Sequence, residues 1–579
     1  MPTSVASVDH FPAVSPAGTE RLLGASTSAL ALAACGGGGS GSATSAGGTG
    51  GAAQGAVSPN ALPDAASASR LINQAAFGGN RAALDAMTQK GASAWLTEQM
   101  DMPRSQSMTD WLIAKGFADA AVNGNINGDG GWPNAMWWKL FAAPDAVRQR
   151  AVLAWSEIFV VSSLGLGAVT WKNFALANYW DILEKNAFGN FRSLLDAITL
   201  SSAMGSYLNM KGNQKANAAL GRLPDENYAR EVMQLFTIGL YNLRTDGSLA
   251  LDGSGNPQET YDNTDIQGLA KVFTGWNAST ATDPSGVLAA AAYRHGLPMV
   301  LTSTLHSPEE KRFLGQLVVA KTTVTAEDGA ADLKFALDAL FNHPNTPPFI
   351  SKQLIQRLVT SNPSGAYVAR VAAVFANNGA GVRGDLRAVF QAIWLDAEAR
   401  TPGALPAFGK LREPVLRIVQ WGRTFGATNA DGLWNLGYTD ADTALGQMPL
   451  RAASVFNFFR PGYVPSNSAL GAQNMVAPEF QITAEPTVVG YINYLAGTVN
   501  NARGIKVDYS YELTLATDAG ALVTWLNQSL AGGALEAANL TLITQAVTSI
   551  AATTDAGKLN RVYAALTLVM ASTDYLVQK

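Results

Sequence analysis

The helical repeat that decides the fold first appears in Arg81-Ala82-Ala83-Leu84-Asp85-Ala86-Met87, which is followed after Gly91 by Ala92-Ser93-Ala94-Trp95-Leu96-Thr97-Glu98-Gln99-Met100. Apolar residues recur three or four positions apart, which places them on one face of an α-helix. The glycine between the stretches is a helix-stop signal. We therefore expect two short amphipathic helices here, joined at Gly91.

The same period continues along most of the chain, without a repeat of fixed length. It predicts helices over residues 134–141, 146–161, 173–187, 191–199, 224–239, 265–273, 309–318, 331–341, 349–359, 366–375, 386–395, 411–425, 488–496, 522–530 and 561–571. Strand signals are scarce. Turn-forming residues flank Ser248-Leu249-Ala250-Leu251, which predicts one small β-hairpin between helices. The expected fold class is mainly α, a large irregular multi-helical domain over residues 67–579, as one body or two fused lobes.

The single cysteine, Cys35, follows Ala31-Leu32-Ala33-Ala34 and precedes Gly36. A short apolar stretch that ends in small residues before a cysteine is typical of a lipoprotein signal peptide. The sequence therefore predicts a signal peptide over residues 1–34 and lipidation of Cys35. The alternative is a free thiol in a low-complexity leader.

Residues 35–66 are rich in Gly, Ser and Ala and predict a disordered tether. With a lipid on Cys35, we expect an exported protein held at a membrane, on an outer-membrane, periplasmic or cell-surface face. The chain has 40 Lys and Arg against 44 Asp and Glu, a net charge of −4. That balance argues against nucleic acid as a partner, because nucleic-acid binding needs a basic face.

Several segments together resemble one bacterial family. Two of them are Asp225-Glu226-Asn227-Tyr228-Ala229-Arg230-Glu231 and Leu235-Phe236-Thr237-Ile238-Gly239, and the others are residues 70–78, 187–195, 273–276, 306 with 311–315, 343–344 and 454–458 with 461–463. From about residue 67 to the C-terminus the chain is similar to the "domain of unknown function 1800" family. The resemblance implies an exported protein, often encoded beside a sulfatase-like protein of the "domain of unknown function 1501" family. It implies no reaction and no catalytic residues.

Glu231 is the first candidate for chemistry. Within the predicted helix over 224–239 it lies on the same stripe as Tyr228 and Leu235, so its carboxylate should be desolvated. Desolvation raises the pKa of a carboxyl group toward the range of a general acid. The alternative is a structural carboxylate that accepts hydrogen bonds from an arginine, such as Arg230. Asn227, four residues earlier, shares the face of Glu231.

Two further glutamates are catalytic candidates. Glu157 interrupts an apolar run over residues 151–161, so it is either paired inside the protein or lines a cavity, where it could be the partner of Glu231. Glu226 falls in the first turn of the helix, four residues before Arg230, which favours a routine helix ion pair.

No metal or cofactor is expected. His295, His306 and His343 show no ligand spacing, and residues 123–130 resemble a calcium loop but lack its closing glutamate. Most aromatic residues should belong to the core. Trp132, after a glycine-rich loop, and Trp276, at the end of a helix, could instead stack on sugar rings. The candidate binding residues are Asn227, Arg230, Trp276, Trp132 and His306.

Two functions remain open, and the sequence does not settle whether the protein is an enzyme. The first is an envelope-anchored binding or assembly protein that acts with a partner, such as the sulfatase-like protein, or with a surface polymer. The second is a polysaccharide-directed hydrolase that uses Glu231 with a partner such as Glu157. A cleft beside Glu231 would favour the enzyme, and a sealed Glu231 would favour the binding protein.

Overall fold

The computed structural model describes residues 63–401, 407–501 and 503–579. Every described residue belongs to one compact unit. Cys35, the predicted signal peptide and nearly all of the predicted tether lie outside the described residues. None of the helices in the described part combines the length and the apolar character that a membrane span requires.

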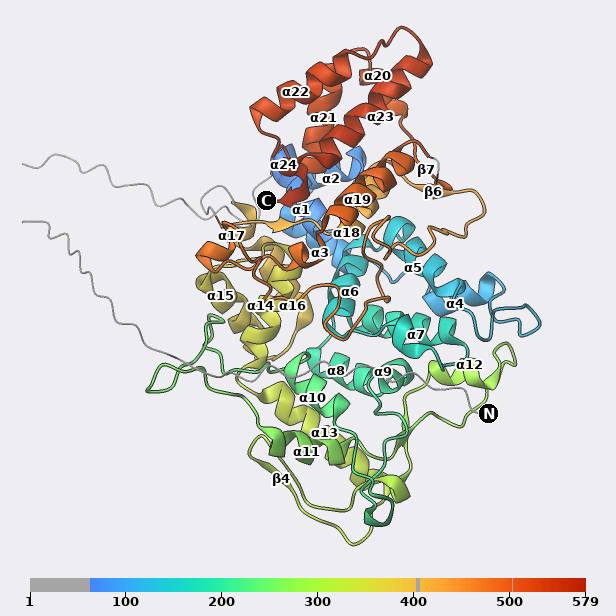
Figure 1. Ribbon diagram of the computed structural model, residues 1–579, viewed down its shortest axis with the longest axis vertical. Helices are drawn as coiled ribbons and strands as arrows, with labels where there is room; N and C mark the ends of the chain where they lie inside the picture. Colours follow the sequence, from blue (N-terminus) through green and yellow to red (C-terminus); the bar gives the residue numbers. More distant parts are fainter. Residues whose placement is uncertain (1–62, 402–406, 502) are drawn as a thin grey trace, which may run out of the picture. The chain divides into compact units, whose positions relative to one another are not determined.

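The described residues fold mainly as α-helices, which confirms the expected fold class (Figure 1). The helices are α1 (Ala65–Ala75), α2 (Arg81–Lys90), α3 (Ala92–Asp101), α4 (Met108–Ala114), α5 (Gly131–Ala142), α6 (Ala146–Ile158), α7 (Lys172–Asn186), α8 (Phe191–Thr199), α9 (Ser202–Tyr207), α10 (Asn227–Gln234), α11 (Asn263–Val272), α12 (Ala290–His295), α13 (Ala326–Asn342), α14 (Thr346–Leu358), α15 (Gly365–Ala376), α16 (Leu386–Leu395), α17 (Ala397–Arg400), α18 (Pro414–Thr424), α19 (Glu485–Val499), α20 (Ser510–Leu515), α21 (Ala519–Ala531), α22 (Ala537–Thr548), α23 (Asp555–Ala571) and α24 (Thr573–Leu576).

Helix α6 lies in the hydrophobic core and is buried along almost its whole length. Trp155 on this helix is fully buried, and its ring packs against those of Phe159, Phe191 and Phe390. Because α6 has no solvent face, any polar side chain on it must find a partner inside the protein or in a cavity. This constraint applies directly to Glu157.

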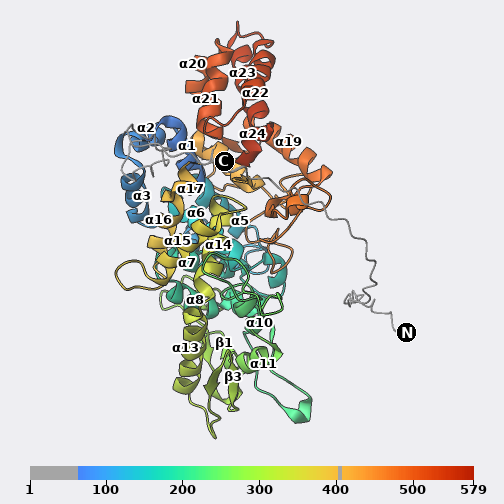
Figure 2. The same cartoon turned by 90° about the vertical axis from the view of Figure 1, so that its left-hand side faces the viewer.

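The ends of the described chain are connected through packing. Helix α1 packs against α21, and Ser69 donates a hydrogen bond of 3.0 Å to the carbonyl of Ser529. Near the C-terminus, Val577 and Gln578 pair with Leu411 and Lys410. Segments far apart in sequence thus support each other, and Figure 2 shows α1 and α21 in a second view.

Strands occur as four two-stranded antiparallel sheets within the described residues. They pair β1 (Trp276–Asn277) with β2 (Val300–Leu301), β3 (Lys311–Phe313) with β4 (Gln316–Val318), β5 (Lys410–Leu411) with β8 (Val577–Gln578), and β6 (Thr428–Asn429) with β7 (Ile505–Lys506). The expected hairpin around residues 248–251 is present as isolated bridges, which join Leu243 to Leu249 and Leu251 to Pro257. We call residues 239–260 the arm, because this segment projects from the helices on the left of Figure 1.

The helix predicted over residues 309–318 is wrong, because this segment is the β3–β4 hairpin. Lys311 and Phe313 are buried while Arg312 between them is exposed, an alternation with the period of a strand. Leu314 and Gly315 both have positive φ, 51° and 71°, as two-residue hairpin turns require. Asp265 on α11 accepts the backbone N–H of Leu314 at 2.6 Å and fixes the turn.

Three other predicted helices are shorter than expected. The one predicted over 146–161 is α6, which ends at Ile158. The helix predicted over 224–239 is α10, so Pro224 lies before it and not in its first turn. The carboxylate of Asp225 accepts the backbone N–H of Asn227 at 2.8 Å, where this helix begins. The helix predicted over 411–425 begins at Pro414, because Leu411 is held in β5.

Candidate ligand-binding cavity

A cavity of about 1090 Å³ lies between α6, α14, the arm and the loops that follow residue 454. It is lined by Glu157, Ile158, Gln234, Leu235, Gly239, Leu240, Tyr241, Leu243, Gly247, Leu249, Phe349, Lys352, Gln353, Gln356, Arg357, Ser361, Asn362, Pro363, Val455, Phe456, Arg460, Pro461, Gly462, Tyr463, Val464, Asn474, Val476 and Gln481. Leu240, Tyr241 and Leu249 of the arm are exposed, so the cavity has a solvent-facing rim on this side.

Helix α14 supplies the longest polar wall of the cavity. Phe349, Lys352, Gln353, Gln356 and Arg357 all line it, with the three- and four-residue spacing of one helix face. At the rise of an α-helix, these positions extend over about 12 Å. The wall is therefore a row of polar side chains with one aromatic ring at its N-terminal end.

Glu157 is the carboxyl group of the cavity. It lies in the last turn of α6 and is 5% exposed. Arg357 holds it at two points, because Nη1 donates to Oε2 of Glu157 at 3.2 Å and Nη2 donates to its backbone carbonyl at 2.8 Å. The two alternatives for Glu157, a paired side chain or a cavity lining, are both realised.

Behind Glu157 lies a buried cluster of charged residues, which we call the carboxylate cluster and which consists of Glu157, Glu413, Glu479, Lys410, Arg357 and Arg150. Lys410 Nζ lies 3.3 Å from Glu413 Oε1 and 3.0 Å from Glu479 Oε1. Lys410 and Arg150 also donate to the carbonyl of Arg357, at 2.7 and 2.6 Å. The cluster ties α6, α14 and the start of α18 together.

The two central carboxyl groups have opposite pKa shifts. Burial, then the charge of Glu413, raises the pKa of Glu157 well above its ordinary value. Burial also acts to raise the pKa of Glu413, but Lys410, a hydrogen bond from Glu157 and the charge of Arg150 outweigh it and lower the pKa. A hydrogen bond joins the two carboxyl groups, and the opposite shifts favour the proton on Glu157.

Some hydrogen-bonding capacity at the cavity is unused. Gln353 is 8% exposed, and its Nε2 has no hydrogen-bond partner among the described residues. Nε of Arg357 is also without a partner there. Buried polar groups are normally paired, so these donors mark places where a ligand or solvent can bind.

Glu231 is buried as predicted, at 6% exposure, and its Oε2 makes no hydrogen bond within the described part of the chain. Burial raises its pKa, against an opposing effect of the charge of Arg230. Glu231 does not line the cavity, although Gln234 and Leu235 on the same helix do. The structure thus separates Glu231 from Glu157, and the two do not face one another across one site.

Glu226, Asn227 and Arg230, the other candidates at α10, are partly exposed and line neither the large cavity nor a second, smaller one. Glu226 and Arg230 form the expected i,i+4 ion pair, at 3.4 Å between partly exposed side chains. The second cavity, of about 530 Å³, is lined by Asp225 together with Asn209 and Lys211. Neither Glu226, Asn227 nor Arg230 lines it.

The two tryptophans considered for sugar stacking belong to the core. Trp132 is fully buried and Trp276 is 5% exposed. Neither lines the two cavities described above. The aromatic rings that do line the large cavity are those of Tyr241, Phe349, Phe456 and Tyr463.

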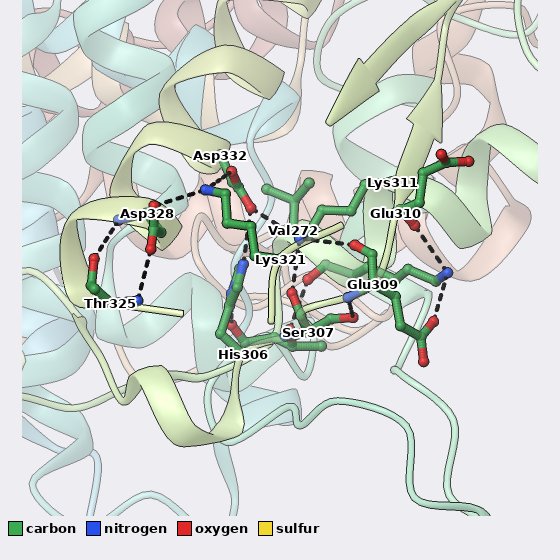
Figure 3. A network of polar contacts seen from close by, with 12 residues as sticks. Val272, His306, Ser307, Glu309, Glu310, Lys311, Lys321, Thr325, Asp328 and Asp332 are labelled. Carbon is green, nitrogen blue, oxygen red and sulfur yellow. Dashed lines mark hydrogen bonds and ion pairs between the residues drawn. The ribbon is translucent and has the colours of Figure 1, made fainter. Parts of the chain in front are cut away.

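His306 takes part in a buried polar network (Figure 3). Its Nδ1 lies 2.7 Å from the carbonyl of Thr274 and its Nε2 lies 3.3 Å from Asp332. Lys311 and Lys321 also approach Asp332, at 2.9 and 3.6 Å. This network connects the β3–β4 hairpin to α13, so His306 has a structural role. His306 does not line the large cavity. Within the described residues no group of three or more His, Cys, Asp or Glu is arranged to hold a metal ion.

Sequence reasoning did not single out Lys352, Gln353, Arg357 or Glu413. A signal was available for the first three, because the predicted helix over 349–359 carries polar residues at helical spacing on what is otherwise a buried helix. Glu413 had no comparable signal, since its partners come from residues distant in the chain.

The comparisons with known proteins agree with the resemblance noted from the sequence. A family model described as "Protein of unknown function (DUF1800)" matches residues 70–577. Neither the curated proteins nor the solved structures include a match to the chain. Two of the segments that carried the resemblance, 235–239 and 454–463, contribute residues to the large cavity. Because the match covers most of its length, the chain belongs to the DUF1800 family of proteins of unknown function.

Proposed function

We propose that this protein binds a segment of a surface polysaccharide in the large cavity. The observation that carries the proposal is the lining, which combines buried polar groups with aromatic rings at a solvent-facing opening. The amide side chains are Gln234, Gln353, Gln356, Asn362, Asn474 and Gln481. Amides both donate and accept hydrogen bonds and so suit sugar hydroxyls, while aromatic rings suit the apolar faces of sugars.

The size of the cavity is compatible with a polymer segment. Ligand pockets for small molecules usually measure roughly 300–1,000 Å³. The volume of about 1090 Å³ lies at the upper end of that range. The polar wall on α14 also offers several successive contact points along its length, as a chain of linked sugars would need.

A polysaccharide hydrolase is the second candidate, and one observation favours it. Burial raises the pKa of Glu157 at the cavity, which favours the protonated state that a general acid requires. Glycosidases ordinarily use two carboxyl groups, about 5–9.5 Å apart, on either side of the scissile bond. Glu157 is the only carboxylate in the lining of the described cavity, so binding is the better-supported function.

The cellular setting belongs to the same proposal. We infer that Cys35 carries a lipid that holds the protein at the cell envelope, where a surface polymer is within reach. Cys35 directly precedes a glycine-rich stretch, which supports a tether between the anchor and the binding body. A sulfatase-like protein acting on the same polymer is the proposed partner.

Affinity electrophoresis of the full-length protein through gels that contain polysaccharides tests the binding function. The cavity variant Gln353→Ala should be retarded several-fold less than the wild-type protein, because it removes the unpartnered donor. Gln545→Ala, at an exposed position on α22, is the matched control and should behave as wild type. Equal retardation of the two variants would contradict a role for the cavity, and release of reducing ends by wild type but not by Glu157→Gln would favour the hydrolase.

A further inference from the structure

The large cavity has more cationic than anionic side chains. Lys352, Arg357 and Arg460 line it, and Glu157 is the only carboxylate of its described lining. Arg357 donates a hydrogen bond to Glu157, and neither Lys352 nor Arg460 makes an ion pair within the described residues. The lining therefore has an uncompensated positive charge.

Lys352 is the most informative of these cations. Its Nζ donates a hydrogen bond of 3.3 Å to the carbonyl of Gly247 in the arm. Burial lowers its pKa, and the charge of Asp246 only partly offsets this. The carboxylate of Asp246 is itself occupied, because Oδ1 accepts the N–H and the hydroxyl of Ser248 at 2.9 and 2.6 Å. Lys352 is thus a partly buried cation without a carboxylate in contact.

The neighbours of Lys352 on the cavity wall are also hydrogen-bond donors. Gln353, the next residue on α14, leaves its Nε2 unused, and Arg357 leaves its Nε unused. In the loop after residue 454, the guanidinium of Arg460 lies 4.4 Å from the ring centroid of Phe456, and Arg460 is exposed. Lysine and arginine have donors and no acceptor, so this wall suits an acceptor-rich ligand.

We propose that the cavity selects an acidic polysaccharide, in which a carboxylate or a sulfate ester is held by Lys352 and Gln353 on α14 and by Arg460 on the loop that also lines the cavity. This inference rests on the proposed polysaccharide-binding function. An oxyanion accepts charge-assisted hydrogen bonds, which are shorter and about twice as strong as neutral ones. A neutral glycan would leave the Lys352 cation unpaired inside the occupied cavity, where an unpaired charge is costly.

The choice of polymer distinguishes a carboxylate from a sulfate ester as the bound group. Polygalacturonate carries carboxylates, chondroitin sulfate carries sulfate esters as well, and dextran has neither. We expect the full-length protein to bind at least one acidic polymer ten-fold or more tightly than dextran at low salt. The preference should fall as salt rises, because exposed charges are screened within about 10 Å at 0.1 M ionic strength.

A pair of lysine variants tests the site itself. Lys352→Met keeps the aliphatic stem and removes the charge, and it should weaken binding to the acidic polymer ten-fold or more, while Lys352→Arg should retain most of it. Lys185→Met removes the same charge from an exposed position on α7 outside the cavity, and it should change binding less than two-fold. Thermal melts of all three variants check that the fold is intact.

The outcomes distinguish a failure of this inference from a failure of the proposed polysaccharide-binding function. Equal binding of dextran and the acidic polymers, or equal losses in Lys352→Met and Lys185→Met, would overturn the acidic selectivity and leave polysaccharide binding in place. Failure of every polymer to bind the wild-type protein would overturn the proposed function and this inference with it.

Discussion

A hydrogen bond joins the carboxyl groups of Glu157 and Glu413, and their two pKa values move in opposite directions. Glu157 faces the cavity, while Glu413 lies in the buried cluster with Lys410. The shifts therefore favour a neutral carboxyl group on the wall that faces a ligand and the negative charge behind it. This relationship determines how stability should depend on pH.

Compared with the wild-type protein, the Glu157→Gln variant should become more stable as the pH rises. Glu157 has a raised pKa in the folded state, so its contribution to stability is complete below the unfolded pKa of about 4.3 and is lost as the pH rises through the folded value. Glutamine imitates the protonated form and does not titrate. The free energy of unfolding from urea melts at pH 4, 6 and 8 should show the variant gaining on wild type by about 1.4 kcal/mol for each unit of pKa shift. Parallel curves for the two proteins would show that Glu157 is ionised in the folded state.

Glu413→Gln should lower the free energy of unfolding by about 3–5 kcal/mol at pH 7. The substitution removes the ionised partner of a buried ion pair and leaves Lys410 with Glu479 alone. Glu226→Gln is the control, because it breaks the partly exposed pair with Arg230 and should cost less than about 1 kcal/mol. Similar losses in the two variants would refute the stabilising role of the carboxylate cluster.

Asp332→Asn should destabilise the protein at neutral pH, and the difference from wild type should shrink in acid. Burial acts to raise the pKa of Asp332, but His306, Lys311 and Lys321 together lower it. Its contribution is therefore present above the unfolded pKa of about 3.9 and is lost as the pH falls through the folded value. Thermal melts at pH 7 and pH 3 measure the difference, and polymer binding at pH 7 should be unchanged because this network lies away from the cavity. A difference that does not shrink at pH 3 would contradict this account.

Gly239→Ala should weaken polymer binding. Gly239 has a φ of 72°, where an L side chain is strained, and an added Cβ would come within 2.6 Å of the ring of Phe349 on the cavity wall. The ring must move for the variant to fold, so the cavity changes shape. Gly253→Ala is a control in the same arm, because no atom lies within 4 Å of its added Cβ. Titration with the polymer should show a several-fold higher Kd for Gly239→Ala and an unchanged Kd for Gly253→Ala. An unchanged Kd for Gly239→Ala would show that Phe349 does not contribute to polymer binding.

Local sequence signals predicted much of the fold. Residues 191–199 and 386–395 form helices with the predicted ends, since apolar spacing and the capping residues Asn190 and Asp385 agree. The segment 309–318 misled the same reasoning, because its strand character depends on a turn at Leu314 that Asp265 holds from another helix. A strand of two or three residues is too short to alter the helical spacing of apolar residues, so this spacing does not reveal it.

The candidate site was predictable only in part. The apolar run around Glu157 correctly predicted that this side chain is paired or lines a cavity. The apolar stripe of α10 correctly predicted that Glu231 is buried. The separation of these two residues depends on tertiary packing, which no local pattern encodes. The same is true of Glu413, which interacts with Glu157 and Arg150 of α6, and of Arg460, whose backbone N–H donates to Gln481.

The most direct test of the central claim, that the large cavity binds an acidic polymer, is amide hydrogen exchange of the full-length protein with and without saturating polygalacturonate or chondroitin sulfate. The account predicts slower exchange in peptides that cover α14 and residues 455–464, because both segments line the cavity. It also predicts no change around the second cavity, at residues 209–225. Protection confined to residues 209–225, or bound polymer that leaves α14 unprotected, would contradict the claim.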